Sequence, residues 1–545
     1  MKKFLVQHQY LLIFIIILLV ASLIRGYKLS DVPHGMAWDE AAIGYNGYAI
    51  FHARRDEWLS RLPVSFRSFG DYKAPFAIYL NGIFTFLFGM NLFAVRLPFF
   101  LASIWAIAGM MLLTQAVFKS QKKLILSDRQ LMLISGSLMA LCPWHIHYSR
   151  VAFEAGMALS FLIWGVFSFY RFVGAKTKKM NFFWIISFVF WQVLSIYTYH
   201  SAKVVVPLLS LVLVMFYYQE LKTKLVSLLT GAILGLGLLF PFIKDSLWGQ
   251  GATRFSQATI FDPTLSLVEN IEVVIIQFFS HFSLNYLIWG QSETLRHAEG
   301  KWGIFLITTL VLLILSFLMV FKKNNWRSPV FWLAIGWIII GIIPAAIGKE
   351  VPHSNRSLLS LPGFLLLATW GMDQILAIIS TFKIDKLIRG SKNEKNLVVK
   401  SVFGCFVLIH LLLFLTYFNH YLSVFAFNSA NDFKDGYLEA FTIAKDYEKG
   451  ENGKPMVDQI VFTTDYGQPY IYALFVRKTN PIWYQGGSLN KYLFKPIDQS
   501  DRQKKNVLVV TSGDDDWPVV EANQVVFGSD QQIKFKLYYL PGGGN

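Results

Sequence analysis

Two adjacent carboxylates, Asp39 and Glu40, lie about fifteen residues after the apolar run LLIFIIILLVASLI at residues 11–24. An isolated Asp-Glu pair is most often a solvated loop feature. A carboxylate held beside a substrate can instead take a proton from a hydroxyl as a general base. The chemistry open to this pair therefore depends on which other reactive groups reach the same side of the membrane.

Acids, cations and imidazoles recur where other apolar runs end. They lie in FGDYKAPF (Asp71, Tyr72, Lys73), PWHIHYSRVAFEAG (Arg150, Glu154), YTYHSAKV (His200), GATRFSQ (Arg254), ETLRHAEG (Arg296, His297) and VPHSNR (His353, Asn355, Arg356). Taken singly, Lys and Arg near helix ends usually extend to the interface, and histidines there are commonly interfacial. Arg150 and Glu154 are four residues apart and could simply pair on one helix face. Taken together, the groups predict a site at the boundary between membrane and water.

The composition predicts a polytopic membrane protein. Of 545 residues, 54% are hydrophobic, 16% are aromatic and only 15% are charged, with a mean hydropathy of +0.45; a soluble domain carries nearer a quarter charged residues. The net charge of +16 is distributed in short clusters between apolar runs. This pattern indicates that the positive charges set the orientation of the helices in the membrane and attract anionic lipids, rather than bind nucleic acid. Cys142 and Cys405 lie within apolar stretches and predict no disulfide framework.

Charge bias predicts the topology. We expect about eleven transmembrane helices, starting near residues 8, 95, 131, 155, 182, 202, 224, 303, 329, 357 and 398. With the N-terminus inside, the inner segments hold about 21 Lys and Arg against about four acids. The first outer loop, about 25–95, then contains an apolar stretch, YLNGIFTFLFGMNLF, that we interpret as an interfacial helix. A second outer loop spans about 244–302.

The chain is predicted to have two domains. Residues 1–427 form the transmembrane domain, and residues 428–545 form a small extracytoplasmic α/β domain, in which YLEAFTIAKDYEKG is helix-like and DQIVFTTD and KNVLVVTSG are strand-like.

The transmembrane domain contains all the candidate groups, and they fit a reaction on an anionic, lipid-anchored substrate. Arg and Lys would bind a phosphate and stabilise its charge as it leaves, while a carboxylate would deprotonate the incoming hydroxyl. A lipid-phosphate-linked sugar meets this description.

Four segments, WDEAAIGYNGYAI, GDYKAPF, FAVRLPFFL and PWHIHYSRVAFEAG, together resemble the polyprenyl-phosphate-sugar-dependent glycosyltransferases of the GT-C class. The resemblance is closer to the bacterial branch related to protein O-mannosyltransferases and to the lipid A aminoarabinose transferase, and it covers roughly residues 8–360. It implies that Asp39 is the catalytic base or acceptor-binding acid, with Glu40 supporting it. It also implies that Lys73 and Arg150 contact the lipid phosphate, that Glu154 organises Arg150, and that direct displacement inverts the anomeric centre.

The remaining candidates rest on topology and charge alone. Arg254, Arg296 and Arg356 are candidates for binding the donor phosphate, and the supporting candidates are Asp71, Tyr72, His200, His297, His353 and Asn355. No HExxH or CxxC spacing is present, so no metal site is predicted; a divalent metal, which some relatives use, is left open. The outer loop at 244–302 is too short for the domain that eukaryotic protein mannosyltransferases insert.

The sequence is compatible with three functions. The first is a glycosyltransferase of the bacterial plasma membrane, acting on the extracytoplasmic face, with a polyprenyl-phosphate sugar as donor and a glycan, lipid or protein as acceptor. The second is a transporter or flippase for lipid-linked saccharides. Such proteins tend to show repeat symmetry and ionisable residues near the bilayer midplane. The third is a membrane sensor or scaffold, which would leave the long first outer loop without a purpose. The charge-poor helix interiors favour the enzyme.

Overall fold

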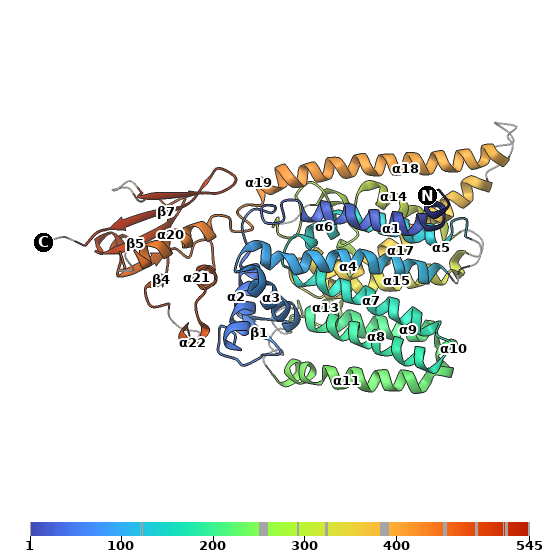
Figure 1. The fold of residues 1–545 in the computed structure, drawn as a ribbon, viewed down its shortest axis with the longest axis horizontal. Coiled ribbons are helices and arrows are strands. Elements are labelled where there is room, and N and C mark those ends of the chain that lie inside the picture. Colours follow the sequence, from blue (N-terminus) through green and yellow to red (C-terminus); the bar gives the residue numbers. More distant parts are fainter. Residues whose placement is uncertain are drawn as a thin grey trace.

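The computed structural model describes residues 2–119, 121, 124–249, 260–290, 294–321, 325–381, 392–450, 455–484, 489–515, 517 and 522–542. A bundle of long helices carries a small sheet domain at one end, and the N-terminus lies at the other end (Figure 1). The bundle contains α1 (Lys2–Gly26), α4 (Leu92–Phe118), α5 (Asp128–Ala140), α7 (Glu154–Val173), α8 (Lys178–Thr198), α9 (Ala202–Phe216), α11 (Leu225–Trp248), α14 (Ile307–Met319), α15 (Pro329–Ala346), α17 (Leu361–Thr381) and α18 (Lys392–His420).

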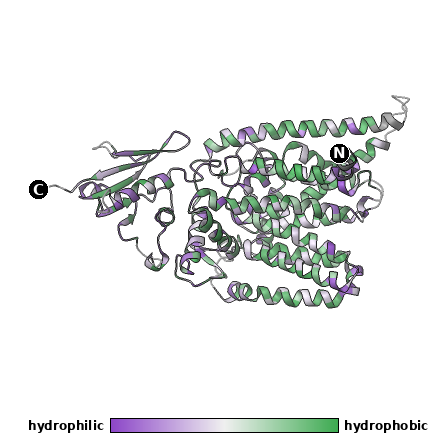
Figure 2. Ribbon diagram, in the orientation of Figure 1, coloured by the Kyte–Doolittle hydropathy of each residue, from purple (hydrophilic) through white to green (hydrophobic). Residues whose placement is uncertain are grey.

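These helices make the chain a multi-pass membrane protein. A helix occupies each of the expected spanning segments, and within the described ranges eight helical stretches are long and apolar enough to cross a membrane. The segments α9 and α14 are shorter apolar helices. Hydrophobic residues cover the bundle, while hydrophilic residues gather at its two ends (Figure 2). Shorter helices connect them: α6 (Pro143–Ser149), α10 (Tyr218–Leu221), α13 (Leu267–Ser280), α16 (Ser354–Ser357) and α19 (Ala426–Asn428).

The third expected span is broken. We expected one helix from about residue 131 through PWHIHYSR, but α5 ends at Ala140 and α6 begins at Pro143. Proline lacks an N–H and clashes with the preceding turn inside a helix, whereas it suits the first position of a new one. The break turns His145, His147 and Arg150 into the protein, and all three side chains are buried.

The segment between α1 and α4 folds against the end of the bundle that carries the C-terminal domain. It contains α2 (Trp38–Ala53), the hairpin strands β1 (Phe66–Ser68) and β2 (Asp71–Lys73), and α3 (Pro75–Phe88). The hairpin turns at Phe69 and Gly70, both with positive φ (55° and 79°), as a tight two-residue turn requires. Helices α2 and α3 pack closely, because a Cβ on Gly82 would lie only 2.5 Å from the Gly47 carbonyl oxygen. As expected of an interfacial helix, α3 is short and apolar and exposes Phe86, Leu87 and Phe88.

The C-terminal domain is a small mixed sheet with helices. Its strands are β3 (Gln459–Phe462), β4 (Tyr492–Phe494), β5 (Val507–Ser512), β6 (Gln524–Phe527) and β7 (Ile533–Leu540), in the order β4-β3-β5-β7-β6. Strand β3 is parallel to β4 and β5, whereas β7 is antiparallel to β5 and β6. The helices are α20 (Tyr437–Lys449), α21 (Pro469–Arg477) and α22 (Pro481–Tyr484).

This domain is docked on α2 through a shared apolar core that includes residues of α2, α20 and α21. Tyr45 is fully buried in that core, and its hydroxyl donates to the Thr479 carbonyl at 3.0 Å. The Tyr472 hydroxyl donates to the Met36 carbonyl at 2.7 Å. The C-terminal domain therefore holds the start of α2, which carries the acidic pair.

Candidate active site

Asp39 lies in the first turn of α2, where the helix dipole favours an anion. The hairpin that precedes α3 brings Lys73 to it: the Lys73 ammonium donates to Asp39 Oδ1 at 2.6 Å. The same ammonium lies 3.7 Å from Glu154 Oε1, at the first residue of α7. The Asp39 side chain is 24% exposed, so it is both paired and within reach of a substrate.

Two more cations converge on Trp38. The Arg296 guanidinium lies 4.8 Å and the Lys434 ammonium 5.2 Å from the centre of an indole ring, distances at which the ring electrons attract a cation. Arg296 Nη1 is also 4.0 Å from Asp39 Oδ2. The site thus gathers three cations and two carboxylates from five separate segments of the chain.

These charges set the protonation of Asp39. Burial acts to raise the pKa of this carboxyl, but the charge and hydrogen bond of Lys73, helped by the charge of Arg296, outweigh it and hold the pKa below its usual value. Asp39 is consequently an anion at neutral pH. It can accept a proton only from a group that becomes strongly acidic during reaction, such as a hydroxyl attacking an electrophilic carbon.

The imidazole of His297 continues the site away from Asp39. Its ring centre is 4.5 Å from that of His353, and its Nδ1 is 3.1 Å from the Tyr148 hydroxyl. Burial, followed by the charges of Arg296 and His147, lowers the pKa of His297 to about 3. Arg356 also contributes to that lowering. His297 is therefore neutral at neutral pH and can donate or accept a hydrogen bond without adding charge.

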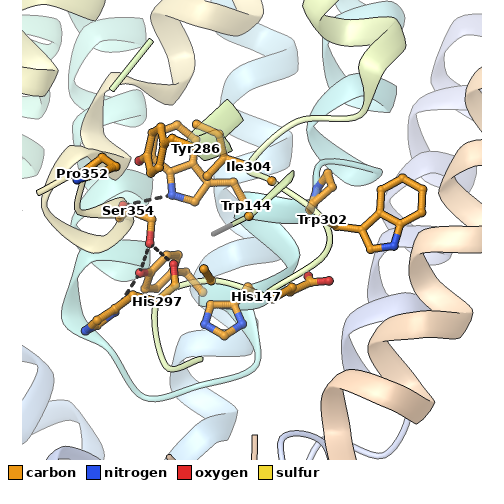
Figure 3. Close-up of a pocket in the computed structure, with 14 residues that line it drawn as sticks. Trp144, His147, Tyr286, His297, Trp302, Ile304, Pro352 and Ser354 are labelled. Carbon is orange, nitrogen blue, oxygen red and sulfur yellow. Dashed lines mark hydrogen bonds between the residues drawn. The ribbon is translucent and has the colours of Figure 1, made fainter. Parts of the chain in front are cut away.

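A pocket lies behind His297 (Figure 3). The Trp144 indole donates to the Ser354 carbonyl at 3.0 Å, and the Ser354 hydroxyl lies 2.7 Å from that of Tyr148. The pocket combines aromatic rings with hydroxyl, imidazole and carboxyl groups, and its lining includes Trp144, His147, Tyr148, Tyr286, His297, Glu299, Trp302 and Ser354. Its volume of about 30 Å³ leaves room for about two water molecules and not for a sugar ring.

Glu40 faces the other way, and its expected role beside Asp39 needs correction. Its side chain is fully buried and holds a two-point ion pair with Arg96, with Nε–Oε1 at 2.9 Å and Nη2–Oε2 at 3.0 Å. The backbone N–H groups of Ala37 and Ala152 also donate to it, at 3.1 and 2.9 Å. These four donors occupy both oxygens, so Glu40 ties α2 to α4 and to the start of α7 instead of contacting a substrate.

Arg150 also departs from expectation. Its guanidinium is fully buried and donates to backbone carbonyls at and after the end of α1, those of Ile24, Arg25, Tyr27, Lys28 and Val32, at 2.7–3.2 Å. A cation is well suited to this place because the last carbonyls of a helix have no partners within it. Arg150 thus caps α1, and Glu154 lies beside Lys73 rather than organising Arg150. We leave Arg150 out of the proposed phosphate site.

The other candidates are spread around this centre. Tyr72 alternates with Asp71 and Lys73 along β2 and so points to the opposite face of the hairpin. His200 lies in the turn between α8 and α9, and its carbonyl accepts the Lys203 N–H at 3.0 Å. Asn355 lies in α16, next to Arg356, whose Nη1 donates to the Lys349 carbonyl at 2.6 Å. Arg254 lies outside the described residues.

The sequence analysis gave no role to three residues that form or support the candidate site. Arg96 was present in the quoted segment FAVRLPFFL but was given no role; a lone Arg at the start of an apolar helix was the available signal. Lys434 lies in the linker to the C-terminal domain, and its sequence context carries no signal that it reaches Trp38. Trp38, directly before Asp39 in the chain, is the ring that two cations approach. In the part of the chain that is described, no group of three or more His, Cys, Asp or Glu could hold a metal ion.

No protein-family model matches the chain, and no curated protein matches its sequence. Solved structures do match in fold. The first is ArnT from Cupriavidus metallidurans bound to undecaprenyl phosphate, with 14% identity, a TM-score of 0.53 and coverage of 97% of this chain and 98% of that one. The oligosaccharyltransferase of Archaeoglobus fulgidus tethered with an acceptor peptide matches with 11% identity, a TM-score of 0.53 and coverage of 94% and 70%.

A further structure of the Archaeoglobus fulgidus protein, AglB in complex with an inhibitory peptide and a dolichol-phosphate, matches with 12% identity, a TM-score of 0.51 and coverage of 93% and 70%. At such identities the likeness concerns the fold, and it extends over nearly the whole of this chain. The expected resemblance is confirmed at that level. The chain has the fold of the GT-C glycosyltransferases ArnT and AglB.

Proposed function

We propose that the protein is a membrane glycosyltransferase that moves a sugar from a polyprenyl-phosphate donor to a hydroxyl of an acceptor. The observation that carries the proposal is the Asp39–Lys73 pair, 2.6 Å apart, with Arg296 4.0 Å from the same carboxylate. A carboxylate that can take a proton, beside cations that can hold a phosphate, is what transfer from a phosphate leaving group requires.

The chemistry is a single displacement. The acceptor hydroxyl oxygen forms a bond to the anomeric carbon of the sugar, the bond between that carbon and the phosphate oxygen breaks, and the hydroxyl proton passes to the Asp39 carboxylate. The bonding electrons leave with the polyprenyl phosphate, whose growing charge is stabilised by Arg296, Lys73 and Arg356. One base suffices, since phosphate leaves without protonation, and a direct displacement inverts the anomeric centre.

The surroundings support the arrangement of the substrates. The bundle supplies apolar surface for the polyprenyl chain, and hydrophilic residues gather at its ends (Figure 2). The fold neighbours support a lipid phosphate as donor, because ArnT was solved bound to undecaprenyl phosphate and AglB with a dolichol-phosphate. We place the site on the extracytoplasmic face of the bacterial plasma membrane, as the charge bias of the loops predicts.

The test is reconstitution of the full-length protein in lipid nanodiscs with radiolabelled polyprenyl-phosphate sugars and candidate glycan, lipid and protein acceptors. We expect transfer to at least one acceptor by the wild type and its loss in Asp39→Asn. Movement of the lipid-linked sugar across the liposome membrane, without transfer to an acceptor, would favour the alternative that the protein is a flippase. Retention of full turnover by Asp39→Asn would show that another group takes the proton.

A further inference from the structure

A polar groove opens where the C-terminal domain meets the linker from α18. Its walls come from the linker, from the loop after β3, from the loop after β5 and from the start of β7, with the lining residues Asn431, Lys434, Asp435, Tyr437, Tyr466, Gly513, Asp514, Gln532, Ile533 and Lys534. None of the candidates from the sequence lies in it. The displacement chemistry of Asp39 does not use it either.

The position of the groove in the sheet is one where ligands bind. Strand β3 is followed by β4 on one side, and the chain then crosses to β5 on the other side of β3. The order of the strands therefore reverses between β3 and β5, and Tyr466 and Gly513 follow their carboxyl ends. In open α/β sheets, ligands bind in the crevice at the carboxyl ends of the strands at such a switch point.

The groove also adjoins the proposed active site. Lys434 lines the groove, and its ammonium lies 5.2 Å from the centre of a Trp38 ring. Gly467, next to Tyr466, packs so closely on Trp38 that a Cβ there would lie 3.3 Å from the indole. Arg296 lies both over the Trp38 ring, at 4.8 Å, and 4.0 Å from Asp39 Oδ2. A molecule lying in the groove can therefore extend a hydroxyl past the indole to the carboxylate.

The charges of the lining are balanced, unlike those around Asp39. Two lysines face two aspartates, and the Lys534 ammonium is already bound by Asp530 at 2.5 Å and by Asn431. The Asp435 carboxylate accepts the N–H groups of Gly436 and Ser529 at 3.0 and 2.7 Å. Asp514 and Gln532 are exposed at the rim, and Tyr466 is half-buried. Carboxylate, amide and phenol groups without excess positive charge are suited to the hydroxyls of a neutral saccharide.

We propose that this groove binds the acceptor, and that the acceptor is a neutral saccharide. The inference rests on the proposed function in one respect, that the bound saccharide is the molecule glycosylated at Asp39. Asp514 and Gln532 hold its hydroxyls, the Tyr466 ring packs on a sugar face, and Lys434 and Trp38 direct the reactive hydroxyl toward the carboxylate.

The experiment is a binding measurement on the full-length protein in nanodiscs. The probes are immobilised neutral hexose and N-acetylhexosamine oligosaccharides, phosphate- or uronate-bearing glycans, and serine- and threonine-containing peptides. The variants are Asp514→Asn and Gln532→Ala, with Asp458→Asn as the matched control, because Asp458 is also exposed but precedes the opposite end of β3. We expect a neutral glycan to bind the wild type and the control equally, and each groove variant about tenfold more weakly.

Preferential binding of anionic glycans or peptides, no binding of any neutral glycan, or equal affinity of Asp514→Asn and Asp458→Asn would each overturn the proposal. The measurement needs no turnover, so the two proposals fail separately. Glycan binding that depends on Asp514 but is accompanied by no transfer would refute the glycosyltransferase and leave a saccharide-binding groove. Transfer that continues with unchanged acceptor KM in Asp514→Asn would refute the groove alone.

Discussion

Asp39 and Glu40 are neighbours in the chain and opposites in the structure. Asp39 is partly exposed and is paired with a single lysine, with Arg296 at the limit of ion-pair distance. Glu40 is fully buried, and four donors hold its two oxygens. Successive residues of a helix point about 100° apart, so one carboxylate faces the open end of the bundle and the other faces its core.

The difference separates a group that can react from a group that holds the reacting group in place. Arg96 binds Glu40 and also donates to the carbonyls of Leu29, Pro33 and Gly35, so the segment leading into α2 is fixed at several points. Arg150 does the same for the end of α1. Saturated charges of this kind have no donor or acceptor left for a substrate, whereas Asp39 and its cations lie where a phosphate and a hydroxyl can reach them.

The largest effect is expected from removing the charge of Asp39. Asp39→Asn should lower the rate of sugar transfer by about 10²–10⁴-fold, the range that general-base catalysis contributes. The free energy of unfolding should change by no more than about 1 kcal/mol, because a partly exposed ion pair contributes little. Single-turnover transfer assays and thermal unfolding of the same nanodisc preparations measure both quantities. A large loss of stability would make Asp39 a structural residue like Glu40.

Neutralising Glu40 should lower the stability of the protein strongly and affect substrate binding little, the opposite of what is expected for Asp39. Glu40→Gln leaves the buried Arg96 without a counter-charge, and breaking a buried pair in this way costs about 3–5 kcal/mol. We therefore expect a sharp fall in thermal stability and in the yield of folded protein, while molecules that remain folded keep their affinity for the donor. The double variant Glu40→Gln/Arg96→Gln should recover part of the stability. Unchanged stability in the single variant would contradict the proposed division between the two carboxylates.

Arg150 tests whether a conspicuous cation belongs to the site or to the scaffold. Arg150→Met removes the donors to the carbonyls that follow α1, and we expect a loss of about 1–3 kcal/mol of stability for the buried acceptors left without partners. Donor affinity, measured by titration with polyprenyl phosphate, should stay within about twofold of the wild type in the folded fraction. Normal stability together with lost donor binding would return Arg150 to the phosphate site.

The smallest effect concerns the link between Lys73 and Asp39. Lys73 lowers the pKa of Asp39, so Lys73→Met should raise that pKa. Since the anion is the active form, the acid limb of the pH–rate profile should move to higher pH, and donor affinity should fall about tenfold with the lost phosphate contact. Lys73→Arg, which keeps the charge, should restore the limb toward its original position. An unmoved acid limb in Lys73→Met would mean that it reports a group other than Asp39.

Much of the fold was accessible from the sequence because lipid imposes simple rules. Helices in a bilayer must satisfy their own backbone, so long apolar runs predict spans, and a helix occupies each expected segment. The break at Pro143 was also readable in principle, since proline disfavours a continuous helix. Its consequence was not, because the inward turn of His145, His147 and Arg150 depends on what the neighbouring helices offer.

The candidate site was likewise predictable in part. Residue type and proximity to membrane ends were enough to select Asp39, Lys73, Arg296 and His297, which the structure brings together. Residue type and position could not separate Asp39 from Glu40, which only the family resemblance ranked, because the two have the same chemistry and differ only in the direction of their side chains. They also missed Lys434, since a linker after the last helix gives no sign that it folds back on Trp38.

The sequence by itself determined that this chain is a membrane bundle with reactive groups at one end, because hydropathy and charge bias act locally and leave direct traces in the chain. Only the tertiary structure decided which charges are satisfied and which are available. That distinction depends on contacts between segments up to hundreds of residues apart, such as Lys434 beside Trp38, and on the rotation of one helix about its axis. Two adjacent acids therefore became a proposed base and a structural anchor.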